Sequence, residues 1–338
     1  MHIGIMFDFA NPSEWRVDPV EFYRRSIERA VWCEELGFHS VWVPEHHFTD
    51  GYPSGTLPIL AAMAARTKRV RLGTGILVAP LHHPVRLAED VATIDVISDG
   101  RIEIGLGLGW AKREYECFNA IPTRRISLYR EIVTVLRQAW TQDELNFKGE
   151  HFTFEGLRVL PKPVQKPHPP LLGGALTVEA ARRIGKLGLA FQWTWIDRAH
   201  ALAYLDGWAE AGHRPEDARI DGYLNLLVCD DPERTWAEVR PHFMYQQSRG
   251  CQDLTIAPGG TFTQKPLSTI ESIEKLRQDG SFLVMTPEDA VAEIRRRSAG
   301  LPVSGFFCFA SICGMRDELS QRHIELMATK VMPALRGL

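Results

Sequence analysis

Short apolar runs alternate with amphipathic stretches along almost the whole chain. The apolar runs are typical of buried strands, and the amphipathic stretches repeat their apolar positions with the period of a helix. The expected strands span residues 2–7, 40–43, 71–77, 101–106, 170–172, 189–195, 223–228 and 305–309. The expected helices span residues 19–36, 57–66, 85–98, 126–140, 177–187, 198–211 and 316–336, with another beginning near residue 232. This alternation predicts an α/β fold, a (β/α)8 TIM barrel.

Two segments interrupt the alternation. Residues 147–161 have the pattern of a hairpin inserted before the fifth strand. Residues 250–283, rich in Gly, Pro, Thr and Gln, form a long excursion before the last repeat. Long connections in a compact domain commonly serve as lids or pocket walls. Because no linker with a shift in composition divides the chain, we expect one barrel domain over residues 1–338.

Composition narrows the class of protein without identifying it. Of the 338 residues, 45% are hydrophobic and 24% are charged, and the formal net charge is −3, which describes an ordinary soluble protein. Nothing in this balance favours nucleic acid or an anionic membrane as a partner, and no apolar stretch is long enough to span a bilayer. The N-terminus has the pattern of a first strand and not of a signal peptide, so we expect a cytoplasmic location. The six cysteines lack a Cys-x-x-Cys spacing, which favours reduced thiols over a zinc site or a disulfide framework.

The strongest candidate chemistry directly follows the second expected strand. Pro44 ends that strand, and Glu45, His46 and His47 come next. A carboxylate and imidazoles at the carboxyl end of a parallel strand are suited to proton transfer near neutral pH. The simpler alternative is that these side chains form a hydrogen-bonded pair, at the surface or in the core, with a purely structural role. A metal site is disfavoured because adjacent histidines in extended chain point in opposite directions.

Three further motifs follow later strands. His82-His83-Pro84 either supplies a second proton donor or simply begins the next helix with Pro84. The run Gly105–Trp110 (Gly-Leu-Gly-Leu-Gly-Trp) allows close approach of a ligand or close packing, but Trp110 replaces the third glycine of a dinucleotide fingerprint. Gly173-Gly174, followed by Thr177 as a helix cap, makes either an anion site suited to phosphate or a plain capped turn.

Aromatic residues gather near the expected strand ends. They are Phe7, Phe9, Trp110, Trp193, Trp195 and Phe309. Core packing accounts for most such patterns, and a broad apolar cavity for a planar ring is the alternative with a functional meaning.

Taken together, these motifs resemble those of the bacterial luciferase-like monooxygenases. The resemblance rests on residues 35–48 (Glu-Leu-Gly-Phe-His-Ser-Val-Trp-Val-Pro-Glu-His-His-Phe), on residues 71–90 followed by Ser98-Asp99-Gly100-Arg101, and on residues 330–335 near the end. It implies a barrel that binds flavin at the carboxyl ends of its strands, either reduced FMN used with O2 or the deazaflavin coenzyme F-420.

The resemblance also assigns roles to single residues. His46 matches the catalytic histidine beside the reactive flavin carbon, and Glu45 matches the neighbouring carboxylate near the ring. Gly75-Ile76 matches a position where the family often has a non-prolyl cis peptide against the ring. The remaining expected cofactor contacts are Gly107, Leu108, Trp110, Arg125, Trp195 and the phosphate loop of Gly174, Ala175 and Thr177. One departure concerns the phosphate: Leu108 stands where luciferase carries an arginine, so Arg125 (or Arg124) is the expected substitute.

The leading functional hypothesis is a monooxygenase that uses reduced FMN and O2 to oxygenate an apolar organic substrate through a flavin peroxide. A separate flavin reductase would supply the reduced FMN, and the resemblance implies a homodimer formed through the first helices. The alternative is a deazaflavin-dependent oxidoreductase that transfers hydride to or from a small substrate, with His46 as an acid/base group. A non-catalytic flavin-binding subunit and a metal-dependent hydrolase on the same fold are two further alternatives.

Overall fold

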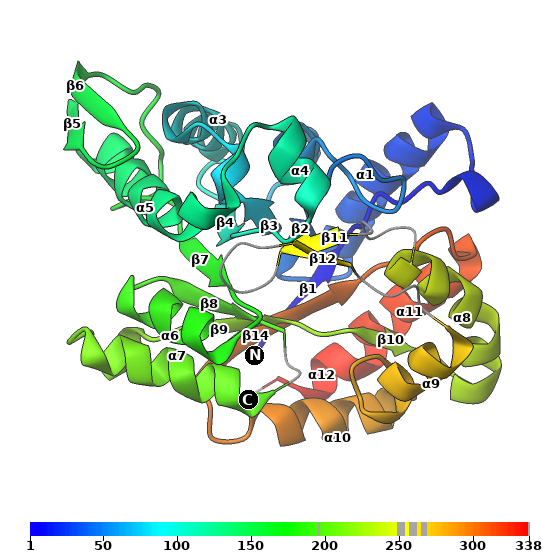
Figure 1. Cartoon of the computed structure of the whole chain (residues 1–338). Helices are drawn as coiled ribbons and strands as arrows, with labels where there is room; N and C mark the ends of the chain where they lie inside the picture. The colour runs from blue at the N-terminus through cyan, green and yellow to red at the C-terminus, as the bar shows by residue number, and fades with distance from the viewer. Residues whose placement is uncertain (195–196, 249–253, 257–261, 265–268, 337–338) are drawn as a thin grey trace.

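Eight parallel strands form a closed barrel in the computed structural model of the chain (Figure 1). The structure describes residues 1–194, 197–248, 254–256, 262–264 and 269–336. In order around the barrel, the strands are β1 (His2–Met6), β2 (Ser40–Val43), β3 (Arg71–Val78), β4 (Ile102–Gly107), β7 (Leu171–Gly174), β8 (Ala190–Trp193), β9 (Ile220–Tyr223) and β14 (Val303–Phe309). The predicted TIM barrel is confirmed.

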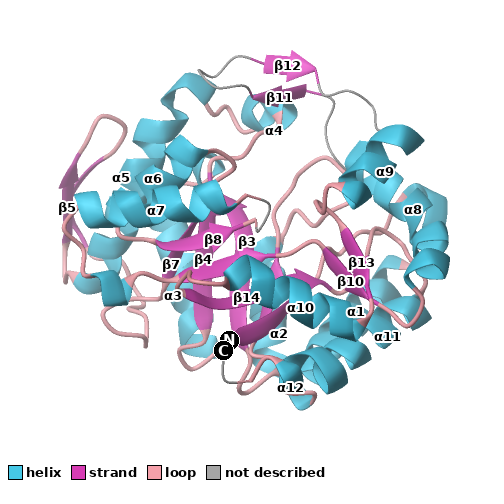
Figure 2. Ribbon diagram, turned by 90° about the horizontal axis from the view of Figure 1, so that it is seen from below, coloured by secondary structure: helices cyan, strands magenta, loops and turns pink. Residues whose placement is uncertain are grey.

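Helices surround the strands and bury their outward-facing apolar side chains (Figure 2). They are α1 (Pro19–Glu35), α2 (Thr56–Arg66), α3 (Pro84–Ile97), α4 (Lys112–Cys117), α5 (Arg125–Thr141), α6 (Val178–Lys186), α7 (Arg198–Glu210), α8 (Pro232–Ser248), α9 (Ile270–Gln278), α10 (Pro287–Ser298) and α11 (Asp317–Leu326). The predicted last helix is interrupted, since α11 passes through a π-helical turn (Met327–Val331) into α12 (Met332–Ala334). Local sequence sets several ends: Asp18 caps α1 through the Glu21 N–H at 2.9 Å, and Pro19 occupies its first position.

One predicted strand is wrong in its bounds. Residues 223–228 do not form a single barrel strand, because β9 (Ile220–Tyr223) ends where that strand was expected to begin. Leu226–Val228 forms β10, which pairs outside the barrel with β13 (Leu283–Met285). An apolar run alone does not reveal which sheet its backbone joins, since both segments are buried.

The expected insertions lie at the two places where the alternation breaks. β5 (Leu145–Lys148) and β6 (Thr153–Leu157) form an antiparallel hairpin beside α5. Within 250–283, the described residues are 254–256, 262–264 and 269–283, which include β11 (Leu254–Ile256), β12 (Phe262–Gln264), α9 and the first residue of β13. The other residues of that expected excursion lie outside the described residues. The hairpin of β11 and β12 lies next to α4 (Figure 1).

The two ends of the barrel differ in what fills them. The amino-terminal end is closed by ion pairs, in which Glu103 binds Arg71 and Arg219, the latter at 2.8 Å, and Arg219 also binds Asp221. At the carboxyl-terminal end, Gly75, Ile76 and Gly174 stay partly exposed although they belong to barrel strands. Because TIM-barrel enzymes carry their chemistry at the carboxyl ends of the strands, this open end is where a site is expected.

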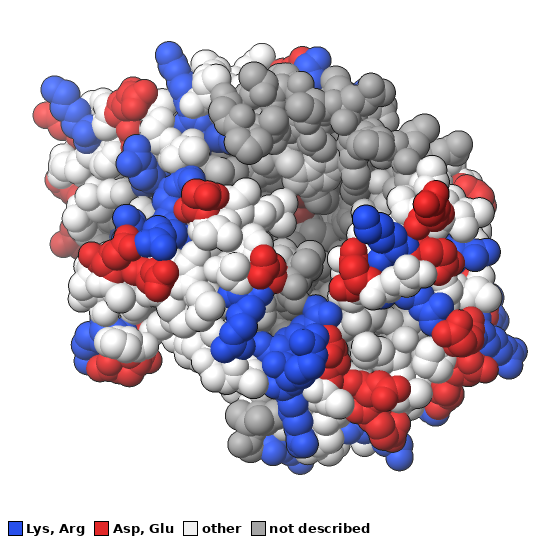
Figure 3. Space-filling model, turned by 60° about the horizontal axis from the view of Figure 1, so that its bottom comes forward, with Lys and Arg blue, Asp and Glu red and all other residues white. Residues whose placement is uncertain are grey.

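The outer surface carries mixed charge. Basic and acidic side chains are interspersed on the described part of the face in Figure 3. No helix among the described residues has both the length and the apolar character that crossing a membrane requires.

Candidate active site

The loop after β2 holds the predicted proton-transfer residues in a fixed conformation. Its backbone closes on itself, because the His46 N–H donates to the Pro53 carbonyl at 3.0 Å. The Thr56 hydroxyl donates to the Pro44 carbonyl at 2.7 Å and ties the loop to the start of α2. The loop therefore presents Glu45, His46 and His47 from a rigid support at the carboxyl end of the barrel.

Glu45 points into the protein, and its side chain is only 3% exposed. Its carboxylate accepts hydrogen bonds from the Val78 N–H at 2.6 Å and from His82 Nε2 at 2.8 Å, and it contacts His47 Nε2 at 3.4 Å. Its own N–H donates to the Ile76 carbonyl at 3.2 Å. Glu45 thus binds the carboxyl half of β3 from two sides and fixes the backbone around Gly75-Ile76.

The ionisation of Glu45 follows from these contacts. Burial alone raises its pKa, but the bonds from His47, His82 and Val78 outweigh burial and lower the pKa to about 2. For His82, burial lowers the pKa, and the bond to Glu45 more than compensates, so that the pKa lies above its usual value. Glu45 and His82 therefore form a buried ion pair over the lower part of the neutral range.

The histidines after Pro44 have different partners. His46 is 21% exposed in its side chain, and its Nδ1 lies 3.3 Å from Glu114 Oε1. The His47 ring packs against Phe118 at 4.6 Å between centroids. His82, which the sequence left as either a proton donor or part of a turn, binds Glu45, while Pro84 begins α3.

Glu114, the partner of His46, was missed by the sequence reasoning. It lies in α4, is completely buried, and accepts from the His47 N–H at 2.9 Å with the same oxygen that meets His46. Its other oxygen, Oε2, is buried without a hydrogen-bond partner in the described part of the chain. No periodic apolar pattern marks the short helix α4, and the only available signal was a pair of acidic residues, Glu114 and Glu116, shortly after the glycine-rich loop.

The contact between Glu114 and His46 assigns the imidazole tautomer. Because a carboxylate only accepts hydrogen bonds, the proton of neutral His46 belongs on Nδ1 and Nε2 is left as an acceptor. No hydrogen bond to His46 Nε2 is recorded among the described residues. The His46 ring lies beside Tyr52 at 4.7 Å and Trp110 at 5.6 Å, which leaves it in a largely aromatic environment.

A glycine-lined wall faces the mouth from β3, β4 and β7. The Gly75–Ile76 peptide is cis, as the family resemblance implied. A Cβ added at Gly107 would lie 2.6 Å from Ile76 Cδ1, and one at Gly174 would lie 3.0 Å from Ile76 Cγ2. Glycine at these positions is therefore what allows the Ile76 side chain to lie directly on β4 and β7.

The predicted phosphate loop has the geometry of a capped helix start. β7 ends at Gly174, and the Thr177 hydroxyl caps α6 by accepting from the Ala180 N–H at 3.2 Å. Burial lowers the pKa of Arg183 in α6, and the positive charges of Arg130 and Arg125 add to that lowering. A capped helix start of this kind is suited to binding an anionic group.

The other predicted contacts fall at the same end of the barrel, with one exception. The Leu108 carbonyl accepts a hydrogen bond from the Tyr115 hydroxyl, and the Leu108 side chain is partly exposed. Ala175 is buried behind Gly174. Trp195, expected beside the flavin ring, lies outside the described residues.

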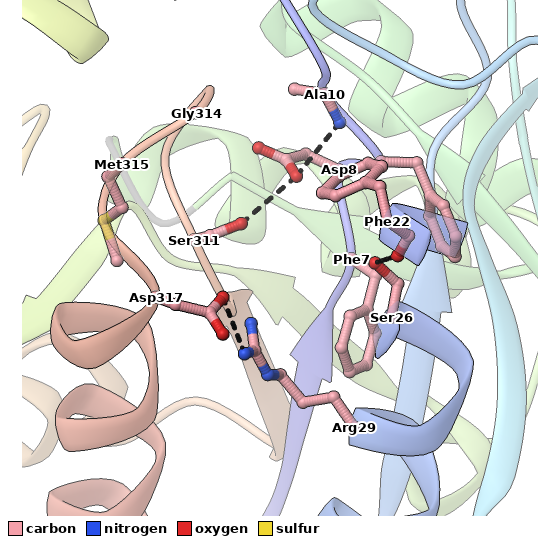
Figure 4. A pocket seen from close by; sticks show the side chains of 11 residues that line it. Phe7, Asp8, Ala10, Phe22, Ser26, Arg29, Ser311, Gly314, Met315 and Asp317 are labelled. Carbon is pink, nitrogen blue, oxygen red and sulfur yellow. Dashed lines mark hydrogen bonds and ion pairs between the residues drawn. The ribbon is translucent and has the colours of Figure 1, made fainter. Parts of the chain in front are cut away.

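A separate small cavity lies beside the barrel between β1, β14 and α1 (Figure 4). It measures about 40 Å³. Burial raises the pKa of Asp8, on its wall, to about 7, against the opposing effect of hydrogen bonds that include the Cys313 N–H at 3.1 Å. Across the cavity Arg29 pairs with Asp317 at 2.8 Å. The polar side chains around this cavity pair with one another. Their contacts link α1 to the segments that follow β1 and β14, and we do not count the cavity as part of the candidate site.

Among the described residues, no group of three or more His, Cys, Asp or Glu side chains is arranged to hold a metal ion. The histidines at the mouth instead make separate contacts with Glu45 and Glu114.

The motifs and the barrel agree with the family comparison. The luciferase-like monooxygenase family matches residues 1–301, and the chain therefore belongs to this family of enzymes. It is 36% identical over 158 residues to the oxygenase component of the flavin-dependent trigonelline monooxygenase of Acinetobacter baylyi, a match covering 45% of this chain and 42% of that protein.

Another relative uses a different cofactor. The chain is 33% identical over 176 residues to the F420-dependent glucose-6-phosphate dehydrogenase of Amycolatopsis mediterranei, covering 48% of this chain and 51% of that protein. Among solved structures, the monooxygenase RslO1 of Streptomyces bottropensis superposes with a TM-score of 0.83 at 25% identity, covering 98% of this chain and 99% of that one.

Proposed function

We propose that this protein is an FMN-dependent monooxygenase that uses reduced FMN and O2 to oxygenate an apolar organic substrate. The observation that carries the proposal is His46, a partly exposed imidazole held by the buried carboxylate of Glu114 at the open end of the barrel. It faces the same mouth as the glycine-lined wall of Gly75, Gly107 and Gly174.

The residues present fit a flavin mononucleotide. The Ile76 side chain, lying on Gly107 and Gly174, forms an apolar surface for a planar ring system. The N-terminus of α6 with Thr177, together with Arg125 at the start of α5, would hold the phosphate. Glu45 would keep the ring-binding wall in place through the Val78 N–H and the Ile76 carbonyl, acting from behind that wall. When bound, reduced FMN supplies the two electrons with which O2 gives one oxygen atom to the substrate and one to water.

The chain's own contribution is to move protons and to exclude water. With Nδ1 held by Glu114, His46 Nε2 accepts a proton from a reacting group and returns it, a role that requires a fixed tautomer. Tyr52 and Trp110 flank the imidazole and shield it from bulk water.

The partners follow from the same proposal. The trigonelline relative is by name an oxygenase component, which supports a separate flavin reductase as the source of reduced FMN here. The homodimer and the cytoplasmic location expected from the sequence belong to this proposal as well.

A deazaflavin-dependent oxidoreductase is the second candidate, because one relative is an F420-dependent dehydrogenase. In that reaction His46 would act as an acid/base group during hydride transfer. Leu108 is compatible with either cofactor, because an apolar side chain contributes no charge to phosphate binding.

Two measurements test the proposal. Thermal unfolding is followed with FMN and with coenzyme F-420 over a range of concentrations, since a ligand that binds only the folded state raises the melting temperature. Apolar candidate substrates are then supplied with reduced FMN and ¹⁸O2. We expect stabilisation by FMN and ¹⁸O in the product; stabilisation by F-420 alone, with no labelled product, would favour the second candidate.

A further inference from the structure

The two sides of the barrel mouth carry side chains of opposite size. On β3, β4 and β7, inward-facing positions are Gly75, Gly107 and Gly174. On β2, β9 and β14, the corresponding positions carry rings. A planar cofactor fits the glycine side, so the ring-bearing side is left to face the substrate.

The rings on that side form a continuous series, which we call the aromatic arc: Tyr52, Phe309, Tyr223, Phe307 and Trp42. Successive centroids are 6.4, 5.2, 6.1 and 4.4 Å apart. Phe307 and Trp42 are buried at the base, whereas Tyr52 and Tyr223 are partly exposed. The arc therefore leads from the barrel core to its open end, and Tyr52 contacts His46 at 4.7 Å.

The orientation of these rings matters as much as their number. Tyr223 and Phe309 meet edge to face at 74°, and Tyr52 and Phe309 are tilted by 47°. Such a wall offers both ring faces and ring edges, and aromatic ligands gain from each of these contacts whereas saturated ligands do not.

A polar group lies beside Tyr223, the middle ring of the arc. The Tyr223 hydroxyl donates to Asn225 Oδ1, which orients the amide and leaves Nδ2 as a donor. Asn225 is partly buried, and among the described residues no hydrogen bond of its Nδ2 is recorded. An oriented amide donor beside an aromatic wall recognises an oxygen acceptor attached to a ring.

We propose that the mouth selects a planar aromatic compound carrying a phenolic or carbonyl oxygen. Its ring lies against Tyr52, Tyr223 and Phe309, and its oxygen accepts a hydrogen bond from Asn225 Nδ2. The assignment of this compound as the substrate rests on the proposed function, but its binding to the arc does not.

The test compares two probes of similar shape, 2-naphthol and its saturated counterpart decahydro-2-naphthol. Binding is measured by calorimetry without cofactor and again with FMN present. We expect 2-naphthol to bind at least about tenfold more tightly, from two or three ring contacts worth about two- to tenfold each. Equal affinities, or displacement of 2-naphthol by FMN, would overturn the proposal.

Substitutions then locate the site. Tyr52→Leu is expected to weaken 2-naphthol about two- to tenfold and to leave the saturated probe unchanged. Asn225→Asp, which keeps an acceptor for Tyr223 but loses the donor, should weaken 2-naphthol also; it is the variant to use if Tyr52→Leu fails to fold. Phe154→Leu is the matched control, because Phe154 stacks on Phe152 in the β5–β6 hairpin, a sheet separate from the barrel, and belongs to no ring pair of the arc. An equal loss in Phe154→Leu, or no loss in either arc variant, would contradict the assignment.

Because these binding measurements need no reduced flavin, they can refute the aromatic site without refuting the proposed function. Binding of 2-naphthol to the arc without FMN-dependent oxygenation would refute the monooxygenase and leave the arc as an aromatic site. Oxygenation of saturated substrates without aromatic preference would support the monooxygenase and refute the arc as an aromatic site.

Discussion

Two carboxylate–histidine pairs lie at the carboxyl end of the barrel, and they differ in how completely their hydrogen bonds are satisfied. Glu45 uses both oxygens, one on the Val78 N–H and one shared with His82. Glu114 uses a single oxygen for His46 and a backbone N–H, and its second oxygen is buried without a partner among the described residues. Both carboxylates are buried, so burial alone does not separate them.

Under the proposed function, this difference separates a structural pair from the pair that takes part in the chemistry. A saturated ion pair has one stable arrangement, and Glu45 uses it to fix the β3 wall. An incompletely satisfied carboxylate costs stability and is retained where chemistry uses it. The partner histidines agree with this division, because His82 is tied to Glu45 and His46 keeps Nε2 for a ligand.

The largest expected effect is that of His46→Ala on turnover. Removing a general acid/base group typically costs about a hundred- to ten-thousandfold in rate. Steady-state product formation with reduced FMN is the measurement, and thermal unfolding should change little because the side chain is partly exposed. His83→Ala is the matched control, since His83 is exposed at the start of α3. Equal activity of the two variants would remove His46 from the mechanism.

Glu45→Gln should act mainly on stability. Breaking a buried ion pair by removing one partner costs about 3 kcal/mol in the free energy of unfolding. Chemical denaturation measures the loss, with Glu28→Gln as control. Glu28 pairs with Arg24 on the exposed face of α1, so its substitution should change the free energy of unfolding far less.

The loss of stability in Glu45→Gln should depend on pH in a direction that follows from the pKa shifts of Glu45 and His82. The folded-state pKa of Glu45, about 2, lies below its usual 4.5, so its contribution is present above pH 4.5 and disappears as the pH falls toward 2. The pKa of His82 is raised above 6.5, so its contribution is present below pH 6.5 and disappears as the pH rises through the raised value. The stability difference between wild type and Glu45→Gln should therefore be largest between pH 4.5 and 6.5. A difference that grows below pH 4 would contradict the pairing.

Glu114→Gln should change the chemistry with little effect on folding. The amide keeps the shape and the bond to the His47 N–H, but it removes a negative charge 3.3 Å from His46 Nδ1. We expect about a tenfold loss of turnover, because the imidazole loses the partner that orients it. Unchanged turnover with lowered stability would make Glu114 merely structural.

Substitutions in the glycine wall should act on stability and on FMN binding. Gly107→Ala places a Cβ 2.6 Å from Ile76 and should cost about 1–3 kcal/mol, whereas Gly174→Ala, at 3.0 Å, should cost less. Both should weaken FMN binding in a titration, in the same order. Tighter FMN binding in either variant would argue against Ile76 as the ring-binding surface.

Sequence patterns identified the parts of the site that are set by residues close to one another along the chain. The apolar run ended by Pro44 placed His46 at a strand end, and Gly174 with Thr177 marked a capped helix, because both are local signals. The partnership of Glu114 with His46 joins residues 68 positions apart, and no spacing rule reveals such a contact. The division of residues 223–228 between two sheets likewise depends on β13, far along the chain.

The most direct test of the central claim is a single-turnover measurement of reduced FMN mixed with O2 in the presence of wild type, His46→Ala or His83→Ala. The time course of flavin oxidation is followed by absorbance over a series of pH values. We predict that wild type and His83→Ala alter the course from that of free FMN in the same way and that His46→Ala does not. A wild-type time course identical to that of free FMN, or one that His46→Ala leaves unchanged, would contradict the account.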